Sequence, residues 1–376
     1  MNLIERLDHL KRSPFQEDAA MIQENGTRAF IDRAFDDFVA AMSLPMVVLG
    51  DRLGLYKAMA GAGPLTSAEL AARTGTAERY VREWLSQQAA GGYVTHDGAS
   101  GRFNLPDEHA AVLADETSPM FLGGAFQLAC GYVHSARHVQ DAFRTGNGVA
   151  YDHQDRDVLA GIERFYLPAY TANLTAIWIP ALAGMPERLE AGARIADVGC
   201  GHGVSTLLLA QAYPASEVMG FDCHAGSIAR ARERAQAAGL AGRARFEVAS
   251  ATEFPGRYDL VLLLDCLHDM GDPGAACRHI HSALEPDGVL LIVEPLAGDR
   301  LEDNLTPLGR AYYAASTLNC VPTSLSQPGG LALGAQAGEA RLREVVTRAG
   351  FGRLRRAAAA PFNLVLEARP WPPKVK

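Results

Sequence analysis

The sequence predicts an α/β fold in which a mostly parallel sheet fills the C-terminal half and a smaller, mainly helical domain precedes it. Three observations lead to this prediction. Gly199, Gly201 and Gly203 separate an apolar run from an amphipathic one, as in a strand, a tight turn and a helix. The next apolar run ends at Asp222. Strand-like and helix-like segments then alternate toward the C-terminus, which favours parallel strands with right-handed crossovers.

The N-terminal half predicts short helices followed by a β-hairpin. Gly75 is a helix-ending residue, and Thr76 directly after it can cap the next helix. The predicted elements are helices over residues 42–59, 66–75 and 77–89 and a hairpin made of residues 92–98 and 103–105. This order is typical of a winged helix-turn-helix.

The middle of the chain predicts two long helices over residues 121–143 and 157–183 that are rich in aromatic residues. Such a stripe is more often part of a core than of a binding site. The segment nevertheless joins two predicted domains, and ligand pockets are common at such junctions. We therefore expect this segment to act as a linker and as a lid over the reactive end of a cofactor.

The C-terminal half predicts a complete Rossmann-like sheet. The apolar run of residues 258–264 marks a strand that is covered on both faces. The other predicted strands are residues 194–196, 217–221, 245–248, 289–293, 354–358 and 362–368, and the predicted helices are 204–212, 225–238, 274–284 and 338–349. The insertion of residues 296–337 is expected to form the opposite wall of a pocket.

The glycine loop carries the prediction of an adenosine-containing cofactor. An acidic residue at the tip of the second strand, here Asp222, usually accepts hydrogen bonds from ribose hydroxyls. Dinucleotide sites use G-x-G-x-x-G, whereas here the sixth position is Val204. Asp197 would face a pyrophosphate unfavourably, but it suits a cofactor with an ammonium and a sulfonium group.

This D-x-G-x-G-x-G stretch, residues 197–203, resembles motif I of class I S-adenosyl-L-methionine (SAM) methyltransferases. The resemblance extends from about residue 189 to the C-terminus and implies SAM as cofactor, S-adenosyl-L-homocysteine as product and an antiparallel last strand. The implied cofactor-binding residues are Asp197, Gly199, Gly201, Gly203, Asp222, Cys223, Ser250, Ala251 and Asp265. Ser250 stands where the family often carries an Asp that binds adenine.

Residues 265–272, D-C-L-H-D-M-G-D, resemble the L-H-D-W-x-D segment of caffeate-type O-methyltransferases, which also carry a winged helix. The resemblance implies that His268 is a general base, that Glu294 orients it and that Asp269 belongs to the same catalytic group. Met270 replaces the Trp of those enzymes, so their substrate class does not carry over. A structural role for His268 is the alternative, and no metal site is predicted.

The aromatic residues supply the predicted acceptor pocket and complete the division of the chain. The pocket residues are Phe126, Tyr166, Tyr170, Trp178, Tyr312 and Tyr313. The predicted segments are an extension (1–30), the winged-helix and dimerisation domain (31–117), the helical linker and lid (118–188) and the SAM-binding domain (189–376).

Composition limits the function classes that remain. The net charge of −8 and the balanced charges of the predicted helix 77–89 make DNA an unlikely partner. No apolar run is long enough to span a bilayer, and six scattered cysteines suit the reducing cytoplasm. We therefore expect a cytoplasmic homodimer that methylates a small aromatic or hydrophobic molecule at oxygen, with methylation at sulfur, nitrogen or carbon as open alternatives. A SAM-sensing regulator and a catalytically silent SAM-binding scaffold are the alternatives, and the whole pattern resembles little-characterised bacterial winged-helix methyltransferases.

Overall fold

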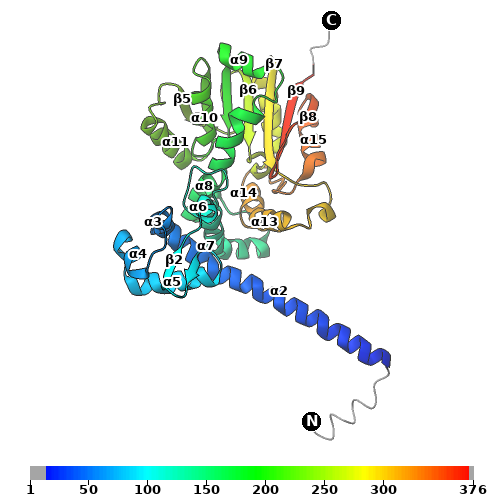
Figure 1. Cartoon of the computed structure of the whole chain (residues 1–376). Helices are drawn as coiled ribbons and strands as arrows, with labels where there is room; N and C mark the ends of the chain where they lie inside the picture. Colours follow the sequence, from blue (N-terminus) through cyan, green and yellow to red (C-terminus); the bar gives the residue numbers. More distant parts are fainter. Residues whose placement is uncertain (1–13, 372–376) are drawn as a thin grey trace. The chain divides into compact units, whose positions relative to one another are not determined.

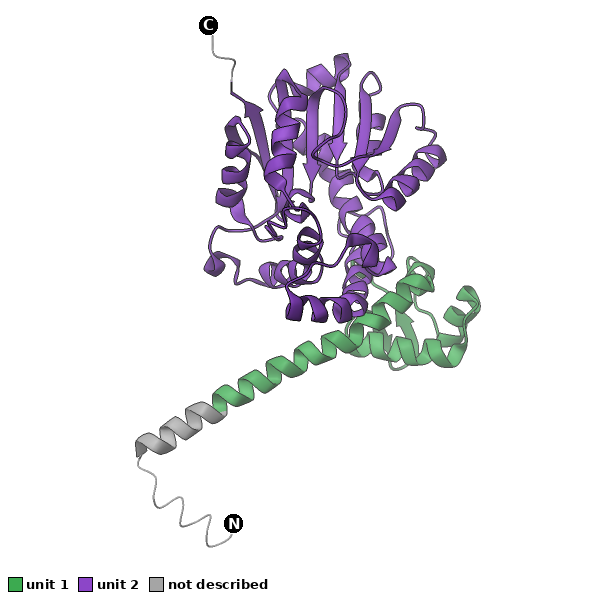
Figure 2. Ribbon diagram, turned by 180° about the vertical axis from the view of Figure 1, so that it is seen from behind, with its two compact units in different colours: residues 1–110 green, residues 111–376 purple. Residues whose placement is uncertain are grey.

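The computed structural model describes residues 14–371, with side chains from residue 25 onward, and divides into two compact units, Met1–Ala110 and Ala111–Lys376 (Figure 2). The predicted extension of residues 1–30 therefore lies partly outside the described residues. Within the described part of the chain, no helix is both long enough and apolar enough to cross a membrane.

The first unit confirms the predicted winged helix-turn-helix. Its elements are α2 (Pro14–Arg52), α3 (Leu55–Met59), α4 (Ser67–Thr74), α5 (Glu78–Ala90), β1 (Thr95–Asp97) and β2 (Arg102–Asn104). Helix α4 begins in a capping box, because Thr66 Oγ1 accepts the Glu69 N–H and the Glu69 carboxylate accepts the Thr66 N–H. The two strands pair antiparallel, and Leu65 adds a bridge to Phe103.

Two predicted boundaries in this unit differ from the structure. The predicted helix of residues 42–59 is interrupted at Gly54, which adopts a left-handed conformation with φ of 68° and separates α2 from α3. The predicted border between residues 30 and 31 falls inside α2, which continues back to Pro14. Between residues 25 and 42 the helix packs against no core, since its apolar side chains there, such as Ile31, Phe35 and Phe38, are exposed.

The second unit is built on a seven-stranded sheet in the order β5-β4-β3-β6-β7-β9-β8 (Figure 1). The strands are β3 (Arg194–Val198), β4 (Glu217–Asp222), β5 (Ala244–Val248), β6 (Tyr258–Leu264), β7 (Leu284–Pro295), β8 (Phe351–Ala359) and β9 (Asn363–Pro370). Strands β3 to β7 pair parallel to one another, and β9 pairs antiparallel to both β7 and β8. This order confirms the predicted Rossmann-like sheet with an antiparallel last strand.

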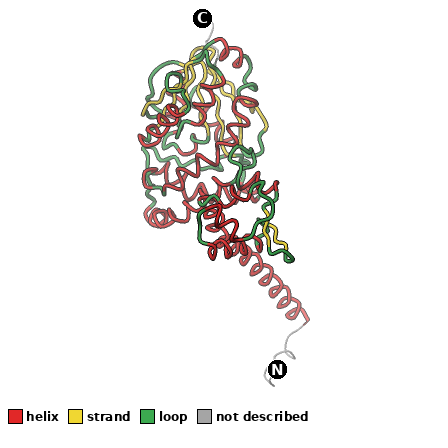
Figure 3. The backbone as a smooth tube through the Cα atoms, turned by 60° about the vertical axis from the view of Figure 1, so that its left-hand side comes forward, coloured by secondary structure: helices red, strands yellow, loops and turns green. Residues whose placement is uncertain are grey.

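Helices cover both faces of this sheet, which produces three layers (Figure 3). One face packs against α9 (Met185–Ala191), α10 (Val204–Ala212), α11 (Ala225–Ala237) and the π-helical turn η2 (Leu174–Trp178). The other face packs against α12 (Pro273–Ala283) and α15 (Gly338–Arg348). The central strand β6 is apolar from Leu260 to Leu264, and all five of these residues are buried, as in a strand covered on both faces.

The remaining helices extend beyond the carboxyl ends of the parallel strands. They are α7 (Gly123–Thr145), α8 (Arg156–Asn173), α13 (Pro307–Ala315), the π-helical turn η5 (Ser316–Cys320) and α14 (Val321–Leu325). Helix α6 (Asp107–Leu113) spans the border between the two units. The predicted turn at residues 285–288 lies within β7, where the pairing shifts from Tyr258–Leu284 to Leu260–Val289 and leaves the extra residues as an irregularity.

Candidate active site

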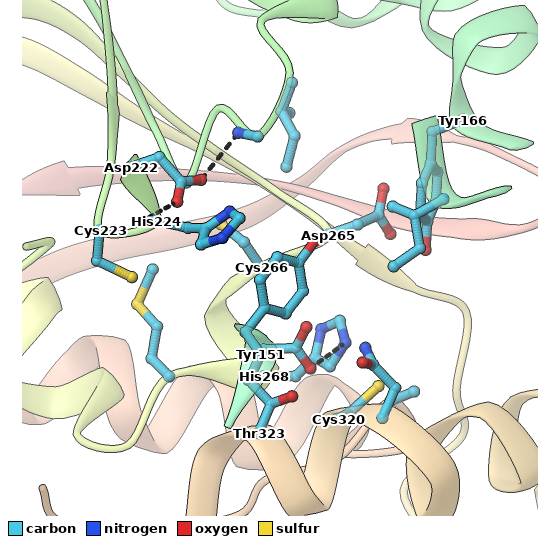
Figure 4. A pocket seen from close by; sticks show the side chains of 18 of the residues that line it. Tyr151, Tyr166, Asp222, Cys223, His224, Asp265, Cys266, His268, Cys320 and Thr323 are labelled. Carbon is cyan, nitrogen blue, oxygen red and sulfur yellow. Dashed lines mark hydrogen bonds and ion pairs between the residues drawn. The ribbon is translucent and has the colours of Figure 1, made fainter. Parts of the chain in front are cut away.

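A cavity of about 1000 Å³ lies in the second unit, where the parallel strands end (Figure 4). Its lining comes from the glycine loop, from the ends of β4 and β6 and from helices α7, α8 and α13. Ligands of open α/β sheets bind in the crevice outside the carboxyl ends of the strands. The cavity therefore lies where the fold favours a binding site.

The three glycines of the loop are required for different reasons. All three have positive φ, with values of 75° at Gly199, 52° at Gly201 and 77° at Gly203. A Cβ at Gly199 would lie 2.7 Å from Cys266 Sγ, and a Cβ at Gly203 would lie 2.7 Å from the Phe246 ring. A Cβ at Gly201 would meet no atom within 4 Å, and this residue lines the cavity. Gly199 and Gly203 thus allow close packing, whereas Gly201 leaves open space for a ligand.

Asp222, at the end of β4, connects the glycine loop to the next turn. Its Oδ2 accepts the Gly201 N–H at 2.9 Å, and its Oδ1 accepts the His224 N–H at 2.8 Å. Burial raises the pKa of this carboxyl, although the two backbone N–H groups oppose that change. Each oxygen keeps lone-pair capacity, so the carboxylate can still accept hydroxyl protons from a ligand. Asp222, Cys223, Ser250 and Ala251 all line the cavity, and their contact with a cofactor stays a prediction.

Asp197 lies behind the loop and is not among the residues that line the cavity. Its Oδ2 accepts hydroxyl hydrogen bonds from Ser205 and Thr206, both at 2.6 Å, at the start of α10. Its Oδ1 is buried without a hydrogen-bond partner, and burial raises the pKa of the carboxyl. Asp197 therefore fixes the helix after the loop, and its contact with a ligand stays a prediction.

His268 and Glu294 meet at the ends of neighbouring strands, as the sequence predicts. Nδ1 of His268 is paired with Glu294 Oε2, and Glu294 Oε1 also accepts the Leu267 N–H at 2.9 Å. On the other side of the ring, Nε2 lies 3.2 Å from Asp269 Oδ1. His268 and Asp269 line the cavity, and Glu294 supports them from behind. Glu294 thus fixes the orientation of the imidazole.

The charges around His268 favour its protonated form. Burial alone would lower the pKa of His268, but Glu294 and Asp269 raise it well above its ordinary value. Burial in turn raises the pKa of Asp269, which the charge of His268 opposes. The donor atoms of His268, Asp269 and Cys320 all lie within 4.8 Å of one another, so this group also has the composition of a possible metal site.

Asp265 follows β6 and has a strained backbone with φ of 51°, which is uncommon for a residue other than glycine. Its two carboxylate oxygens accept hydrogen bonds from Tyr170 Oη at 2.9 Å and Asn363 Nδ2 at 3.0 Å. Burial is the largest of the effects that raise its pKa to about 8. Strain and perturbed titration of this kind are concentrated at functional sites.

The aromatic prediction divides into two groups. Tyr166, Tyr170 and Tyr312 line the cavity, and the rings of Tyr166 and Tyr170 stack with centroids 5.5 Å apart. Phe126, Trp178 and Tyr313 do not line it. Trp178 is buried in the core below the sheet, because the helix changes to a π-turn at Leu174 and this alters the direction of the following side chains.

Several cavity residues were missed by sequence reasoning. Glu163 on α8 accepts a hydrogen bond from His202 Nδ1 at 2.6 Å and pairs with Arg234 of α11. Asp152 is not part of the lining, but it lies 2.8 Å from Nε2 of the cavity residue His224. Tyr132 and Tyr151 also line the cavity. The one available signal was the position of Glu163 as an acidic residue in a helix rich in aromatic side chains.

Two parts of the chain match known protein families. Residues 189–350 match a family described as a methyltransferase domain, and residues 40–115 match the Rv2258c-like winged helix-turn-helix domain. The chain thus contains a methyltransferase domain that is preceded by a winged helix-turn-helix domain. The matched residues lie close to the predicted domains 31–117 and 189–376.

Individual relatives agree with this family. The chain is 28% identical to the acetylserotonin O-methyltransferase of Mus musculus over 93% of its own length and 90% of the relative. Its matches to two curated relatives of higher identity span only 24% and 57% of their lengths. The solved mitomycin 7-O-methyltransferase superposes with a TM-score of 0.67 at 21% identity, covering 92% of this chain and 99% of that one.

A second solved structure shows a similar fold with ligands present. It is the O-methyltransferase NcsB1 from neocarzinostatin biosynthesis in complex with SAM and 2-hydroxy-5-methyl naphthoic acid. Its TM-score is 0.58 at 22% identity, with 87% of this methyltransferase and 94% of that chain covered. The prediction of SAM as cofactor agrees with this neighbour.

Proposed function

We propose that this methyltransferase transfers the methyl group of SAM to a hydroxyl oxygen of a small aromatic molecule, with His268 as general base. The observation that carries the proposal is the pairing of His268 with Glu294 in a cavity that also contains the glycine loop and Asp222. The proton acceptor and the cofactor residues thus share one enclosed space.

The residues on one side of the cavity fit SAM. Gly201 leaves open space next to Asp222, whose oxygens can accept the ribose hydroxyls. Cys223, Ser250 and Ala251 continue this wall toward the adenine. When bound, SAM supplies a methyl group that is already activated on a sulfonium. The chain therefore has to place an oxygen nucleophile and remove its proton.

His268 is suited to remove that proton. Glu294 holds Nδ1 and leaves Nε2 directed to the side of Asp269 and the cavity. General-base catalysis of this kind contributes roughly 10² to 10⁴-fold in rate. Because Glu294 and Asp269 raise the pKa of His268, its base form becomes populated only as the pH rises. Turnover should therefore increase on the alkaline side of neutrality.

The tyrosines and α13 supply orientation. Tyr166 and Tyr170 stack on one side, and Tyr312 lies on the insertion that was predicted to form the other wall. Flat aromatic acceptors can bind between such rings, and the same side chains exclude water from the reacting oxygen. Holding the two reactants in line can supply several kcal/mol of the reduction in the barrier, on the order of 7–11 kcal/mol in the best cases.

Steady-state kinetics and calorimetry on two variants test this proposal. His268→Gln should lower kcat by roughly 100-fold or more while the affinity for SAM stays within about twofold, since the ring does not hold the cofactor. Glu294→Gln should lower kcat less and shift the alkaline rise of the pH profile to lower pH. Unchanged kcat in His268→Gln would remove the base assignment. Absence of SAM binding to the wild-type protein would remove the whole proposal.

We also propose that the protein is a homodimer formed through α2. Ile31, Phe35, Phe38 and Met42 recur at intervals of four, three and four residues, as along a coiled-coil seam. These four side chains are 55%, 61%, 56% and 60% exposed. A second copy of the same helix offers a complementary apolar stripe.

Sedimentation analysis of the full chain tests the dimer. Phe35→Glu combined with Phe38→Glu should convert it to a monomer, whereas Val133→Glu on α7, an apolar residue that is 66% exposed, should leave the dimer intact. A monomeric wild-type protein at micromolar concentration would refute this assignment. The six free cysteines favour a reducing compartment, so we place the proposed activity in the cytoplasm.

A further inference from the structure

The acidic residues of the cavity differ in whether a cationic side chain lies next to them. Among the described residues that line it, five are acidic and none is Lys or Arg; the acidic ones are Glu163, Asp222, Asp265, Asp269 and Asp272. On the cofactor side, Glu163 is neutralised by Arg234 and receives a hydrogen bond from His202. At the edge of the cavity, Asp272 caps α12 and lies 3.8 Å from Arg278.

The acidic groups next to the proposed base have no such cations. Asp265 is held by Tyr170 and Asn363, which are neutral donors. Asp269 and Glu294 share a single imidazole, that of His268. Three carboxyl groups therefore surround one basic side chain at the place where the acceptor has to bind.

We propose that the acceptor site selects uncharged or cationic aromatic molecules and rejects acceptors that carry a carboxylate. This inference rests on the proposed function and specifies its substrate class. An acceptor carboxylate would have to leave water and lie near Asp265 and Asp269 without an arginine or lysine to pair with. A bound carboxylate would oppose ionisation of these buried carboxyl groups and would lack a cationic partner, whereas an ammonium group would gain a carboxylate partner.

The titration of Asp265 agrees with this selection. Burial and the neighbouring Glu294 raise its pKa to about 8, so this group of carboxyls disfavours a further negative charge. A cation beside Asp265 would favour the ionised carboxylate. The aromatic rings of Tyr166, Tyr170 and Tyr312 add faces on which a cation can lie.

Three fluorescent probes that differ in one substituent test the selection. They are 6-(aminomethyl)-2-naphthol, 6-(hydroxymethyl)-2-naphthol and 6-hydroxy-2-naphthoic acid. Each is titrated at pH 7 into the full-length protein saturated with S-adenosyl-L-homocysteine, so that binding is measured without turnover. We expect the carboxylate probe to bind at least tenfold more weakly than the hydroxymethyl probe, and the aminomethyl probe to bind at least as tightly.

A charge placed at the cavity wall provides the matched variants. Ala314 on α13 lines the cavity and is exposed, and neither the catalytic group nor the cofactor loop includes it. Ala314→Lys should improve binding of the carboxylate probe at least fivefold and weaken binding of the aminomethyl probe. Ala314→Gln, which adds similar length without charge, should leave the ratio between the probes unchanged.

The outcomes separate this inference from the proposed function. Equal or tighter binding of the carboxylate probe to the wild-type protein would overturn the charge selection, even if SAM-dependent methylation of phenols is observed. Failure of all three probes to bind would overturn it as well, because the tyrosine-lined side would then not be an acceptor site. Failure of S-adenosyl-L-homocysteine to bind would instead contradict the proposed function itself.

Discussion

Replacement of Asp265 by Asn should make the thermal stability of the protein less dependent on a rise in pH. The carboxyl has an ordinary pKa of 3.8 and titrates at about 8 in the folded protein. Between these values the folded state binds more protons than the unfolded state, so stability falls as the pH rises. Over the three pH units from 5 to 8, at about 1.4 kcal/mol per unit, the loss amounts to roughly 4 kcal/mol.

Asn is the appropriate replacement because Asp265 is mostly neutral at pH 7 in the empty site. The amide can accept one of the two hydrogen bonds from Tyr170 and Asn363 and donate in the other. In a unit of this size about 1 kcal/mol corresponds to roughly 2–4 °C in Tm, so the wild type should lose about 8–16 °C more than Asp265→Asn between pH 5 and pH 8.

Thermal unfolding of both proteins without ligand, followed by tryptophan fluorescence from pH 5 to pH 8, measures this difference. The pKa values of Asp197, Asp222, Asp269 and His268 are also raised, so both proteins should become less stable with pH. The difference in Tm between the two proteins across this pH range therefore reports the contribution of Asp265 alone. The exposed surface variant Asp287→Asn should follow the wild type. Parallel curves for the wild type and Asp265→Asn would refute the reasoning that burial governs this carboxyl.

Three other perturbations have defined outcomes. Gly203→Ala should destabilise the protein by roughly 3 kcal/mol in a urea titration and abolish SAM binding, because its Cβ would meet the Phe246 ring. The control Gly239→Ala, which has open space around its Cβ, should lower the free energy of unfolding by only about 1 kcal/mol. Zinc ions should inhibit methyl transfer by binding next to His268, and Cys320→Ser should weaken that inhibition about tenfold in a dose-response assay. Equal inhibition of the wild type and the serine variant at the same zinc concentration would argue against this group of ligands. In a mobility-shift assay at physiological salt, the protein should not retard duplex DNA, because both arginines of the outer face of α5 are paired with glutamates. A salt-sensitive shift would instead support the hypothesis of a SAM-sensing regulator.

The sheet could be predicted from the sequence because its strands are long apolar runs that end at chemically distinctive residues. Residues 258–264 coincide with β6, and Asp222 ends β4 as expected. The same reasoning brought His268 and Glu294 together, since the ends of neighbouring parallel strands lie side by side. Local sequence patterns are sufficient to predict this pair, because residues at the ends of adjacent strands become neighbours once the strand order is known.

Contacts that depend on helix packing could not be predicted in this way. Glu163 and Arg234 are far apart in the sequence, and their pairing depends on how α8 lies against α11. The contact between Asp265 and Asn363 depends on the register of the antiparallel strand β9, which begins at Asn363. Trp178 was placed in the pocket from the aromatic content of its segment alone, but tertiary packing buries it in the core of the second unit.

These unpredicted contacts also determine the charge of the site. Glu163 and Asp265 are both acidic residues on the wall of one cavity, but the fold gives Glu163 a guanidinium and gives Asp265 only a hydroxyl and an amide. Burial of a carboxylate without a cation is unfavourable, so Asp265 retains its proton until a positive charge arrives. His268 is shared by Asp269 and Glu294, and within the described lining no Lys or Arg is present, so in the proposed reaction further positive charge has to come from the bound ligands. The fold therefore makes ionisation of Asp265 dependent on ligand binding. The ionisation of Glu163 has no such dependence, because Arg234 already neutralises that carboxylate.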